Sequence, residues 1–350
     1  MQILILAGGK GTRLWPLSRK KSPKQLQRIL SDQSLLQATA ERAELFTSAA
    51  NIFVVVSNEF QLTEVREQLP RLRPEHIFQE PEGRGTAAAI SFGVASMVRG
   101  GVPANESVLV LSADHLISNP EILAEKILVG LDFLATYPDY LLTLGIVPTY
   151  PETGYGYIEV GAELAPGVLS VRRFHEKPDK DAAIGYVTAG NALWNSGMFL
   201  WHAETILERI AACNPDLGAI IAATLQGTVT AQTYAAAAVE SIDKAVLERD
   251  IKLAVLPTPI TWTDIGHWQA VRDWQRTATE SNTIEGRHIG VNTTRSLVIN
   301  RSNRLVTTVG VDNLIIIDTG DALLICDANA TQDVRALVAA IETTEGEELT

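Results

Sequence analysis

The sequence predicts an α/β protein with a mostly parallel, Rossmann-like sheet covered by helices on both faces, followed by a small β-rich C-terminal domain. Short, continuously apolar runs recur through residues 1–150, and stretches with helical periodicity separate them. Continuous apolar runs are typical of parallel strands covered on both faces, and their alternation with helices indicates βαβ units. After residue 290, short apolar runs recur at a regular spacing, which predicts the second domain.

The first strands and helices alternate along the chain. The predicted strands are the runs QILIL, IFVVVS, VLVLSAD and YLLTLGIV, at residues 2–6, 52–57, 108–114 and 140–147. The predicted helices cover residues 34–46, 63–69, 86–98 and 120–137. In sheets of this kind ligands bind beyond the carboxyl ends of the strands. We therefore expect the glycines after the first strand, and Asp114 at the end of the third, to face a ligand.

The middle of the chain, residues 151–282, mixes both kinds of element. Runs at 155–161 and 171–178 predict strands that bound a cleft, and periodicity predicts helices at 203–213 and 243–250. This region therefore continues the α/β domain.

The tail has a different pattern. Four apolar runs follow one another at spacings of 8, 9 and 9 residues, beginning at Leu297, Leu305, Leu314 and Leu323. Asn, Gly and Asp turns separate them, which indicates short stacked strands in a β-helix-like or meander arrangement. Periodicity at 331–342 predicts a closing helix. We place the domain boundary between residues 1–282 and 283–350.

Composition excludes several classes of protein. A net charge of −12 disfavours nucleic acid as the main partner, although a local basic pocket can still bind small anions. The two cysteines, Cys213 and Cys326, have no disulfide-framework or metal-cluster spacing. The apolar start at 1–6 is too short for a signal peptide, and no run approaches the ~20 apolar residues of a membrane span. These features predict a cytoplasmic protein without a membrane partner.

The loop after the first strand, AGGKGTR, has the composition of a phosphate-binding loop. Gly8, Gly9 and Gly11 allow close backbone approach and positive φ angles, which amides need when they surround an anion. The cations of this stretch are Lys10, Arg13, Lys20, Lys21 and Lys24. The loop is not a Walker A sequence, because no lysine follows Gly11, and not a dinucleotide fingerprint, because position 14 is leucine. A third kind of triphosphate loop is therefore expected.

The stretch LAGGKGTRLWPLSRKKSPKQ resembles the signature of sugar-phosphate nucleotidylyltransferases, and its WPLSR and PKQ segments resemble the mannose-1-phosphate guanylyltransferase branch. Further motifs follow in the family's order: EPEGRGTAAAI, VLSADH, GYGYIEVG, FHEKPD, WNSGMF, WTDIGHW and VGVDNLIIIDTGDALLIC. The resemblance implies the nucleotidyltransferase fold for residues 1–282. The chain resembles the short, monofunctional members, which lack an additional C-terminal isomerase domain.

The resemblance implies a reaction in which GTP and α-D-mannose 1-phosphate give GDP-mannose and pyrophosphate. The sugar phosphate attacks the α-phosphorus in line, so positioning and charge neutralisation dominate. Asp114 and Asp264 match the family's metal positions and imply an Mg²⁺ site, since Mg²⁺ takes one or two carboxylates together with substrate phosphates.

The implied substrate contacts fall into three sets. Arg13 is expected at the β- and γ-phosphates, and Lys24 near the α-phosphorus. The nucleotide-binding residues are expected to be Leu6, Ala7, Gly8, Gly9, Gly11, Thr12, Arg13, Lys24, Glu80 and Gly85. Glu80 or the backbone around it would accept from guanine. The sugar phosphate would be bound by Gly156, Glu176, Lys177 and Asn195, with Lys177 on the phosphate.

Two alternatives stay open at this point. The same chemistry could serve another nucleotide or another hexose 1-phosphate, or the chain could be a non-catalytic regulatory subunit that binds a sugar nucleotide. The retained cations and carboxylates favour a catalyst. We also expect a homo-oligomer, a dimer.

Overall fold

The computed structural model describes residues 1–9, 11–249, 252–276, 281–346 and 349–350. The chain forms two compact units. Unit 1 consists of Met1–Gly8, Thr39–Ala113 and Ile117–Trp262, and unit 2 consists of Gly9–Ala38, Asp114–Leu116 and Thr263–Thr350. The glycine-rich stretch thus groups with the C-terminal segment. The domain boundary after residue 282 stays a prediction.

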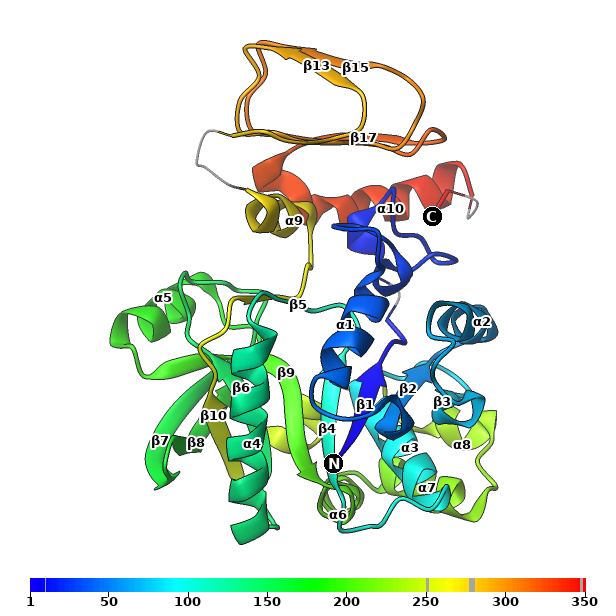
Figure 1. Cartoon of the computed structure of the whole chain (residues 1–350), viewed down its shortest axis with the longest axis vertical. Coiled ribbons are helices and arrows are strands. Elements are labelled where there is room, and N and C mark those ends of the chain that lie inside the picture. The colour runs from blue at the N-terminus through cyan, green and yellow to red at the C-terminus, as the bar shows by residue number, and fades with distance from the viewer. Residues whose placement is uncertain (10, 250–251, 277–280, 347–348) are drawn as a thin grey trace. The chain divides into compact units, whose positions relative to one another are not determined.

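Unit 1 is built on a nine-stranded sheet with the order β3-β2-β1-β4-β9-β6-β10-β8-β7. Its strands are β1 (Gln2–Leu6), β2 (Ile52–Val56), β3 (Ile77–Gln79), β4 (Ser107–Ser112), β6 (Leu141–Ile146), β7 (Tyr157–Ala165), β8 (Val168–His175), β9 (Ala192–His202) and β10 (Leu253–Pro257). β9 runs antiparallel to β4, β6 and β7, and β8 runs antiparallel to β7 and β10. The other strands of this sheet share one direction, which confirms the predicted mostly parallel sheet (Figure 1).

Helices cover both faces of this sheet, as predicted. Leu4 of β1 packs against α3, where a Cβ on Gly93 would lie 2.8 Å from its side chain. Leu200 of β9 packs against α4, where a Cβ on Gly130 would lie 2.9 Å from its side chain. Leu200 pairs with Leu109 of β4, and Leu109 pairs with Ile3 of β1, so Leu200 and Ile3 project to the same face of the sheet. Leu4 follows Ile3 in the strand and therefore projects to the opposite face. The helices are α1 (Leu35–Glu44, shared by the two units), α2 (Glu59–Gln68), α3 (Thr86–Arg99), α4 (Pro120–Thr136), α5 (Lys180–Ala189), α6 (Ala203–Cys213), α7 (Pro215–Gln226) and α8 (Ala231–Ala236).

Most of the predicted elements lie within a few residues of their expected bounds. β9 is the main strand that the sequence analysis missed. The WNSG segment interrupts its apolar pattern, but strands on both sides of β9 bury it in the sheet. The helix predicted at 243–250 is a short π-helix, Asp243–Leu247. Short 3₁₀ turns are Ala49–Asn51 and Pro74–His76. β5 (Leu116–Ile117) and β11 (Trp262–Thr263) lie where the chain passes from one unit to the other.

Unit 2 contains the predicted β-helix-like fold. Its strands are β12 (Thr283–Glu285), β13 (His288–Val291), β14 (Leu297–Asn300), β15 (Val306–Val309), β16 (Leu314–Asp318) and β17 (Leu323–Asp327). β12, β14 and β16 stack in parallel, as do β13 and β15, and β17 closes the larger sheet antiparallel to β16 (Figure 1). The other elements are two 3₁₀ turns of the N-terminal stretch (Thr12–Leu14 and Lys24–Leu26), α9 (Trp268–Gln275), a 3₁₀ segment (Ala328–Asp333) and α10 (Val334–Thr344), the predicted closing helix.

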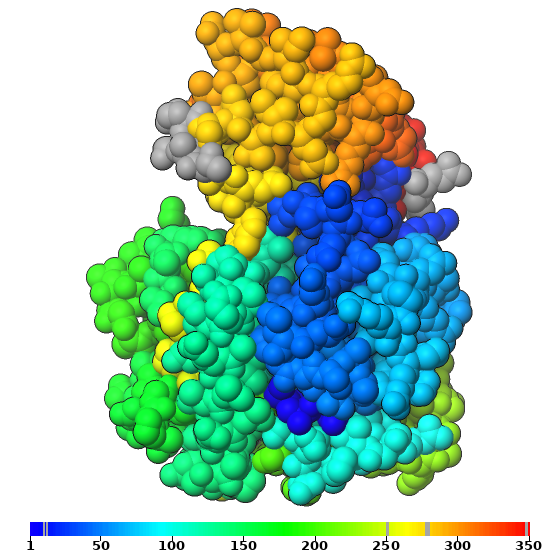
Figure 2. Space-filling view, in the orientation of Figure 1, coloured from blue at the N-terminus to red at the C-terminus, as the bar shows by residue number. Residues whose placement is uncertain are grey.

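The core of unit 2 joins both ends of the sequence. Leu14 and Trp15 of the glycine-rich stretch are buried in one cluster with Trp268, Ile317 and Val338 of the C-terminal segment. Figure 2 shows the blue N-terminal atoms packed directly against yellow and orange atoms of that segment. The stretch after β1 is therefore supported by residues about 250 to 320 positions later in the chain.

Two further expectations concern the chain as a whole. Within the part that the structure describes, no helix has the length and apolar character needed to cross a bilayer. Cys213 and Cys326 are free thiols, each half-buried.

Candidate active site

The carboxyl end of β1 lies between its neighbours β2 and β4. Ala7 donates its amide to the Val55 carbonyl at 2.8 Å, and the Leu6 carbonyl accepts from the Ala113 amide at 3.0 Å. A Cβ on Gly8 would lie 2.3 Å from Ser57 Oγ, so a side chain at this position would have to displace the Ser57 hydroxyl. The backbone of Leu6, Ala7 and Gly8 thus ends the central strand where ligands bind in sheets of this kind.

Glu80, the predicted acceptor for guanine, is a buried carboxylate of unit 1. Its side chain is 2% exposed, and Oε1 lies 3.1 Å from the hydroxyl of the fully buried Tyr234. Ser57 Oγ lies 3.4 Å from Oε2. Burial raises the pKa of Glu80 to about 7, against the hydrogen bonds from Tyr234 and Ser57, which lower it. Glu80 can therefore change its charge near neutral pH.

Tyr234 is a residue that the sequence analysis did not identify. Its hydroxyl also lies 3.2 Å from the Ala88 carbonyl, so its single proton serves either that carbonyl or Glu80. It comes from the short helix α8, which carries no chemical motif, so a single sequence offers no signal for it.

Gly85, predicted beside the base, begins α3 with a φ of +85°. A Cβ there would lie 2.5 Å from the Glu240 carbonyl oxygen. Both observations require glycine, whatever binds nearby.

The glycine-rich stretch of unit 2 is held by side chains from its own neighbourhood. Gln25 Nε2 donates to the Gly9 carbonyl at 2.8 Å, and Ser18 Oγ donates to the Gly11 carbonyl at 2.6 Å. Gly11 has a φ of +55°, and a Cβ on it would lie 2.6 Å from Lys24 Cγ. The loop conformation is therefore specified by glycine and by these two hydrogen bonds.

Lys24, Asp114 and Asp264, which lie far apart in the sequence, come together in unit 2. Lys24 Nζ forms an ion pair with Asp114 Oδ2 at 2.9 Å and donates to the Asp264 carbonyl at 2.8 Å. Asp264 Oδ1 accepts the Gly266 amide at 2.9 Å. Three of the five predicted catalytic residues therefore share one site.

The carboxylate oxygens at this site suit a hard cation such as Mg²⁺ better than a metal that prefers nitrogen or sulfur ligands. Carboxylate oxygens are the ligands that Mg²⁺ prefers, and it commonly takes only one or two of them. No cluster of three or more His, Cys, Asp or Glu side chains occurs among the described residues, so a dedicated protein cage is not found there.

The remaining cations of the loop differ in their surroundings. Arg13 and Lys21 are exposed, whereas Lys20 lies 3.2 Å from Glu342 in an ion pair. Lys10 and the side chain of Thr12 lie outside the described residues. Arg13 is thus a solvent-accessible guanidinium on the loop.

The four predicted sugar-phosphate residues come together in unit 1. The Gly156 carbonyl accepts a hydrogen bond from the main-chain N–H of Asn195 at 2.8 Å. A Cβ on Gly156 would lie 3.0 Å from Glu176 Oε2. Lys177 forms an ion pair with Glu176 and holds a φ of +47°, which is unusual for a residue with a side chain. The Glu176 side chain is 13% exposed and that of Lys177 58%, so the ammonium group remains accessible.

The side-chain amide of Asn195 is oriented by its surroundings. Its Oδ1 accepts from Thr143 Oγ1 and the Gly197 amide, both at 3.2 Å, and its Nδ2 donates to Asp243 Oδ1 at 2.9 Å. These contacts leave one N–H of the amide for a ligand.

Asp243 is the second residue that the sequence analysis missed. Burial and the nearby Glu176 carboxylate raise its pKa to about 6. It begins the π-helix, and such helices are frequent at functional sites. The sequence places it in a predicted helix without further signal.

Aromatic rings line the same region of unit 1. Tyr155 packs against Trp194 and Trp262, with ring centroids 5.3 Å and 4.9 Å apart. Tyr150 meets Trp194 edge-on at 5.0 Å. The two tryptophans are buried, so Tyr150 and Tyr155 are the rings of this cluster that a sugar could contact.

Comparisons with known proteins identify the family of the chain. The family model for nucleotidyl transferases matches residues 2–281, and the model for the MannoseP isomerase/GMP-like beta-helix domain matches residues 286–341. Mannose-1-phosphate guanylyltransferase ManC of Salmonella typhimurium is 37% identical over 354 residues, covering 97% of this chain and 72% of the relative. Mannose-1-phosphate guanylyltransferase of Escherichia coli K12 is 36% identical, covering 97% of this chain and 73% of the relative.

A solved structure covers nearly the whole chain. It is a Thermus thermophilus protein named mannose-1-phosphate geranyltransferase, with a TM-score of 0.89 and 31% identity, and the match covers 97% of this chain and 99% of that one. These matches confirm the predicted family and fold. The chain belongs to the nucleotidyl transferase family and, within it, to the mannose-1-phosphate guanylyltransferases.

Proposed function

We propose that the protein forms GDP-mannose and pyrophosphate from GTP and α-D-mannose 1-phosphate. The observation that carries this proposal is the site in unit 2 where Lys24 contacts the Asp114 carboxylate and the Asp264 main chain. A cation and two acidic residues beside a glycine loop suit displacement at a phosphate, which needs positioning and charge neutralisation. Family membership supplies the identity of the substrates.

The two units contribute different groups to the proposed reaction. In unit 2, Lys24 would stabilise charge near the α-phosphorus, and the exposed Arg13 would take two oxygens of the departing pyrophosphate. Asp114 and Asp264 would hold Mg²⁺, which when bound neutralises phosphate charge and helps to orient the in-line attack.

Unit 1 would bind the parts of the substrates that do not react. Lys177 would hold the phosphate of mannose 1-phosphate, while Glu176 and the oriented amide of Asn195 would bind sugar hydroxyls. Ionised Glu80 would accept from N1–H and N2–H of guanine with the lone pairs that Tyr234 at Oε1 and Ser57 at Oε2 leave open.

The test is a matrix of substrate pairs with the purified protein. Five nucleoside triphosphates and five hexose 1-phosphates are assayed for pyrophosphate release in the presence of Mg²⁺. We expect GTP with mannose 1-phosphate among the best pairs. A preference for another pair would keep the proposed chemistry but contradict the proposed substrates. No pyrophosphate release with any pair would favour the regulatory-subunit alternative. The homodimer and the cytoplasmic location stay predictions, and light scattering measures the first.

A further inference from the structure

An ion pair connects the glycine-rich stretch to the β-helix inside unit 2. Arg19 Nη1 lies 2.7 Å from Asp321 Oδ2, and Arg19 Nη2 donates to Asp321 Oδ1 at 2.9 Å. Two parallel contacts between one guanidinium and one carboxylate make this a bidentate pair, which fixes the orientation of both groups. The Arg19 side chain is only 18% exposed.

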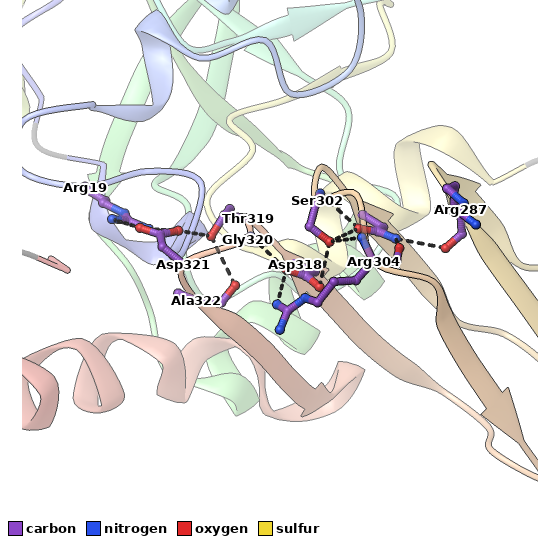
Figure 3. Close-up of polar contacts among 10 residues, drawn as sticks. Arg19, Arg287, Ser302, Arg304, Asp318, Thr319, Gly320, Asp321 and Ala322 are labelled. Carbon is purple, nitrogen blue, oxygen red and sulfur yellow. Dashed lines mark hydrogen bonds and ion pairs between the residues drawn. The ribbon is translucent and has the colours of Figure 1, made fainter.

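The β-helix holds the Asp321 carboxylate in place (Figure 3). Asp321 lies in the turn between β16 and β17, where Thr319 Oγ1 donates to its Oδ1 at 2.8 Å. The Gly320 amide donates to the buried Asp318 at 2.8 Å, and Arg304 donates to the same carboxylate at 2.7 Å. The acceptor for Arg19 is therefore part of an ordered network.

On the other side, Arg19 is adjacent in the chain to Ser18, which contacts the phosphate loop. Arg19 Nε donates to the Pro16 carbonyl at 3.1 Å, and its backbone forms a bridge with Ser22. The preceding Ser18 donates to the Gly11 carbonyl, and Gly11 packs against Lys24. The residue that contacts Asp321 and a residue that shapes the loop are therefore consecutive in the chain.

The stretch also has a second anchor, which is independent of this ion pair. Trp268 Nε1 donates to the Trp15 carbonyl at 2.8 Å, and Trp15 Nε1 donates to the Leu349 carbonyl at 2.7 Å. Because the buried core does not depend on Asp321, unit 2 should stay folded when this residue is replaced. The expected effect of the replacement is a change in the position of the loop.

From these contacts we infer that the C-terminal β-helix positions the phosphate loop, with Asp321 as the positioning residue that acts through Arg19. This inference rests on the proposed function, because it assigns to the β-helix a role in binding and using the nucleotide. Asp321 is not itself expected to contact a substrate.

The β-helix offers a matched control. Arg295 Nε donates to Asp312 Oδ1 at 2.8 Å, and its Nη2 pairs with the second oxygen, so the two residues form the same type of pair. Both residues of the control pair lie between β13 and β16, outside the glycine-rich stretch. Asp312→Asn and Asp321→Asn therefore remove the same charge from the same domain.

Two measurements on the full chain test the inference. For Asp321→Asn we expect kcat/KM for GTP to fall about fivefold, the size of a moderately strong ion pair, with KM for mannose 1-phosphate unchanged. In hydrogen–deuterium exchange, the amides of Arg19 and Ser22, which bond each other's carbonyls at 2.9 Å, should exchange faster. Asp312→Asn should change neither measurement.

A charge reversal completes the test. Arg19→Asp and Asp321→Arg should each weaken GTP use, and the double variant should recover most of it. Failure of the double variant to recover, or unchanged exchange in Asp321→Asn, would overturn the positioning role. Exchange is measured without substrates, so it tests the inference even if the protein makes no GDP-mannose. Equal losses in Asp321→Asn and Asp312→Asn would assign both pairs to stability alone.

Discussion

Two largely buried carboxylates of unit 1 and two ion-paired carboxylates of unit 2 have opposite electrostatic surroundings. In unit 1, burial raises the pKa of Glu80 to about 7 and that of Asp243 to about 6, and their partners are a tyrosine hydroxyl and a side-chain amide. In unit 2, Asp114 pairs with Lys24, and Arg19 lowers the pKa of Asp321 to about 2. Glu80 and Asp243 of unit 1 thus have neutral donors, whereas Asp114 and Asp321 of unit 2 pair with cations.

This difference matches the proposed division of labour. Guanine and sugar hydroxyls offer neutral N–H and O–H groups, which buried, oriented acceptors can distinguish. A triphosphate offers charge, which cations and metal-binding carboxylates neutralise. Variants in unit 2 should therefore affect turnover most, and variants in unit 1 should affect the KM of one substrate.

The largest expected effect is that of Asp264→Asn. The substitution removes a metal-binding charge but keeps an oxygen that can accept the Gly266 amide, so the local turn should persist. We expect kcat to fall about 100-fold or more, with weak rescue by additional Mg²⁺. Steady-state assays over a range of Mg²⁺ concentrations measure this, with Asp273→Asn as the control. Full activity would refute the metal assignment.

Lys177→Ala should have the next largest effect, on one substrate. Its accessible ammonium is the proposed partner of the mannose 1-phosphate phosphate, and a charge-assisted hydrogen bond is lost. We expect KM for mannose 1-phosphate to rise about tenfold to 100-fold while KM for GTP stays constant. Lys180→Ala, on the neighbouring helix α5, is the matched control. If only KM for GTP rises, the role of Lys177 is misassigned.

Asp243→Ala should weaken sugar binding through Asn195. The substitution leaves an N–H of the half-buried Asn195 without its acceptor, and the amide loses its fixed orientation. We expect KM for mannose 1-phosphate to rise about tenfold, whereas Asp243→Asn, which keeps an acceptor oxygen, should stay within about threefold. A similar loss in both variants, or a loss in GTP use, would argue against this positioning role.

The sequence predicted the architecture well because it is carried by apolar periodicity. The continuous runs of β1, β2, β4 and β6 identified central strands, and the leucine spacing identified the stacked strands of unit 2. β9 escaped because Asn195, Ser196 and Gly197 interrupt its pattern, although long-range pairing with β4 and β6 makes it a strand.

The site could be predicted only where a motif carries it. The loop, Asp114 and Lys177 stand in recognisable strings, whereas Tyr234 and Asp243 act through contacts 154 and 48 positions away along the chain. Their function depends on tertiary distance and burial, which single-sequence periodicity does not encode. Tyr234 and Asp243 contact groups that are proposed to bind the substrates, and would orient them.

Tyr234→Phe should have the smallest effect, and it tests the hydrogen bond from the Tyr234 hydroxyl to Glu80. Glu80 is protonated below about pH 7 and ionised above it, so KM for GTP should fall as pH rises through that value if the carboxylate reads guanine. The Tyr234 hydrogen bond lowers the pKa of Glu80. Its loss should therefore move this transition to higher pH and raise KM for GTP about threefold at pH 7.

The control for this pH profile is Tyr140→Phe, which removes a hydroxyl from an aromatic group near the end of α4. It should leave the transition in place. Glu80→Gln should abolish the pH dependence, because glutamine does not titrate in this range. A Tyr234→Phe profile that coincides with the wild-type profile would mean that Glu80 does not read the base, and guanine recognition would then fall to the backbone around it.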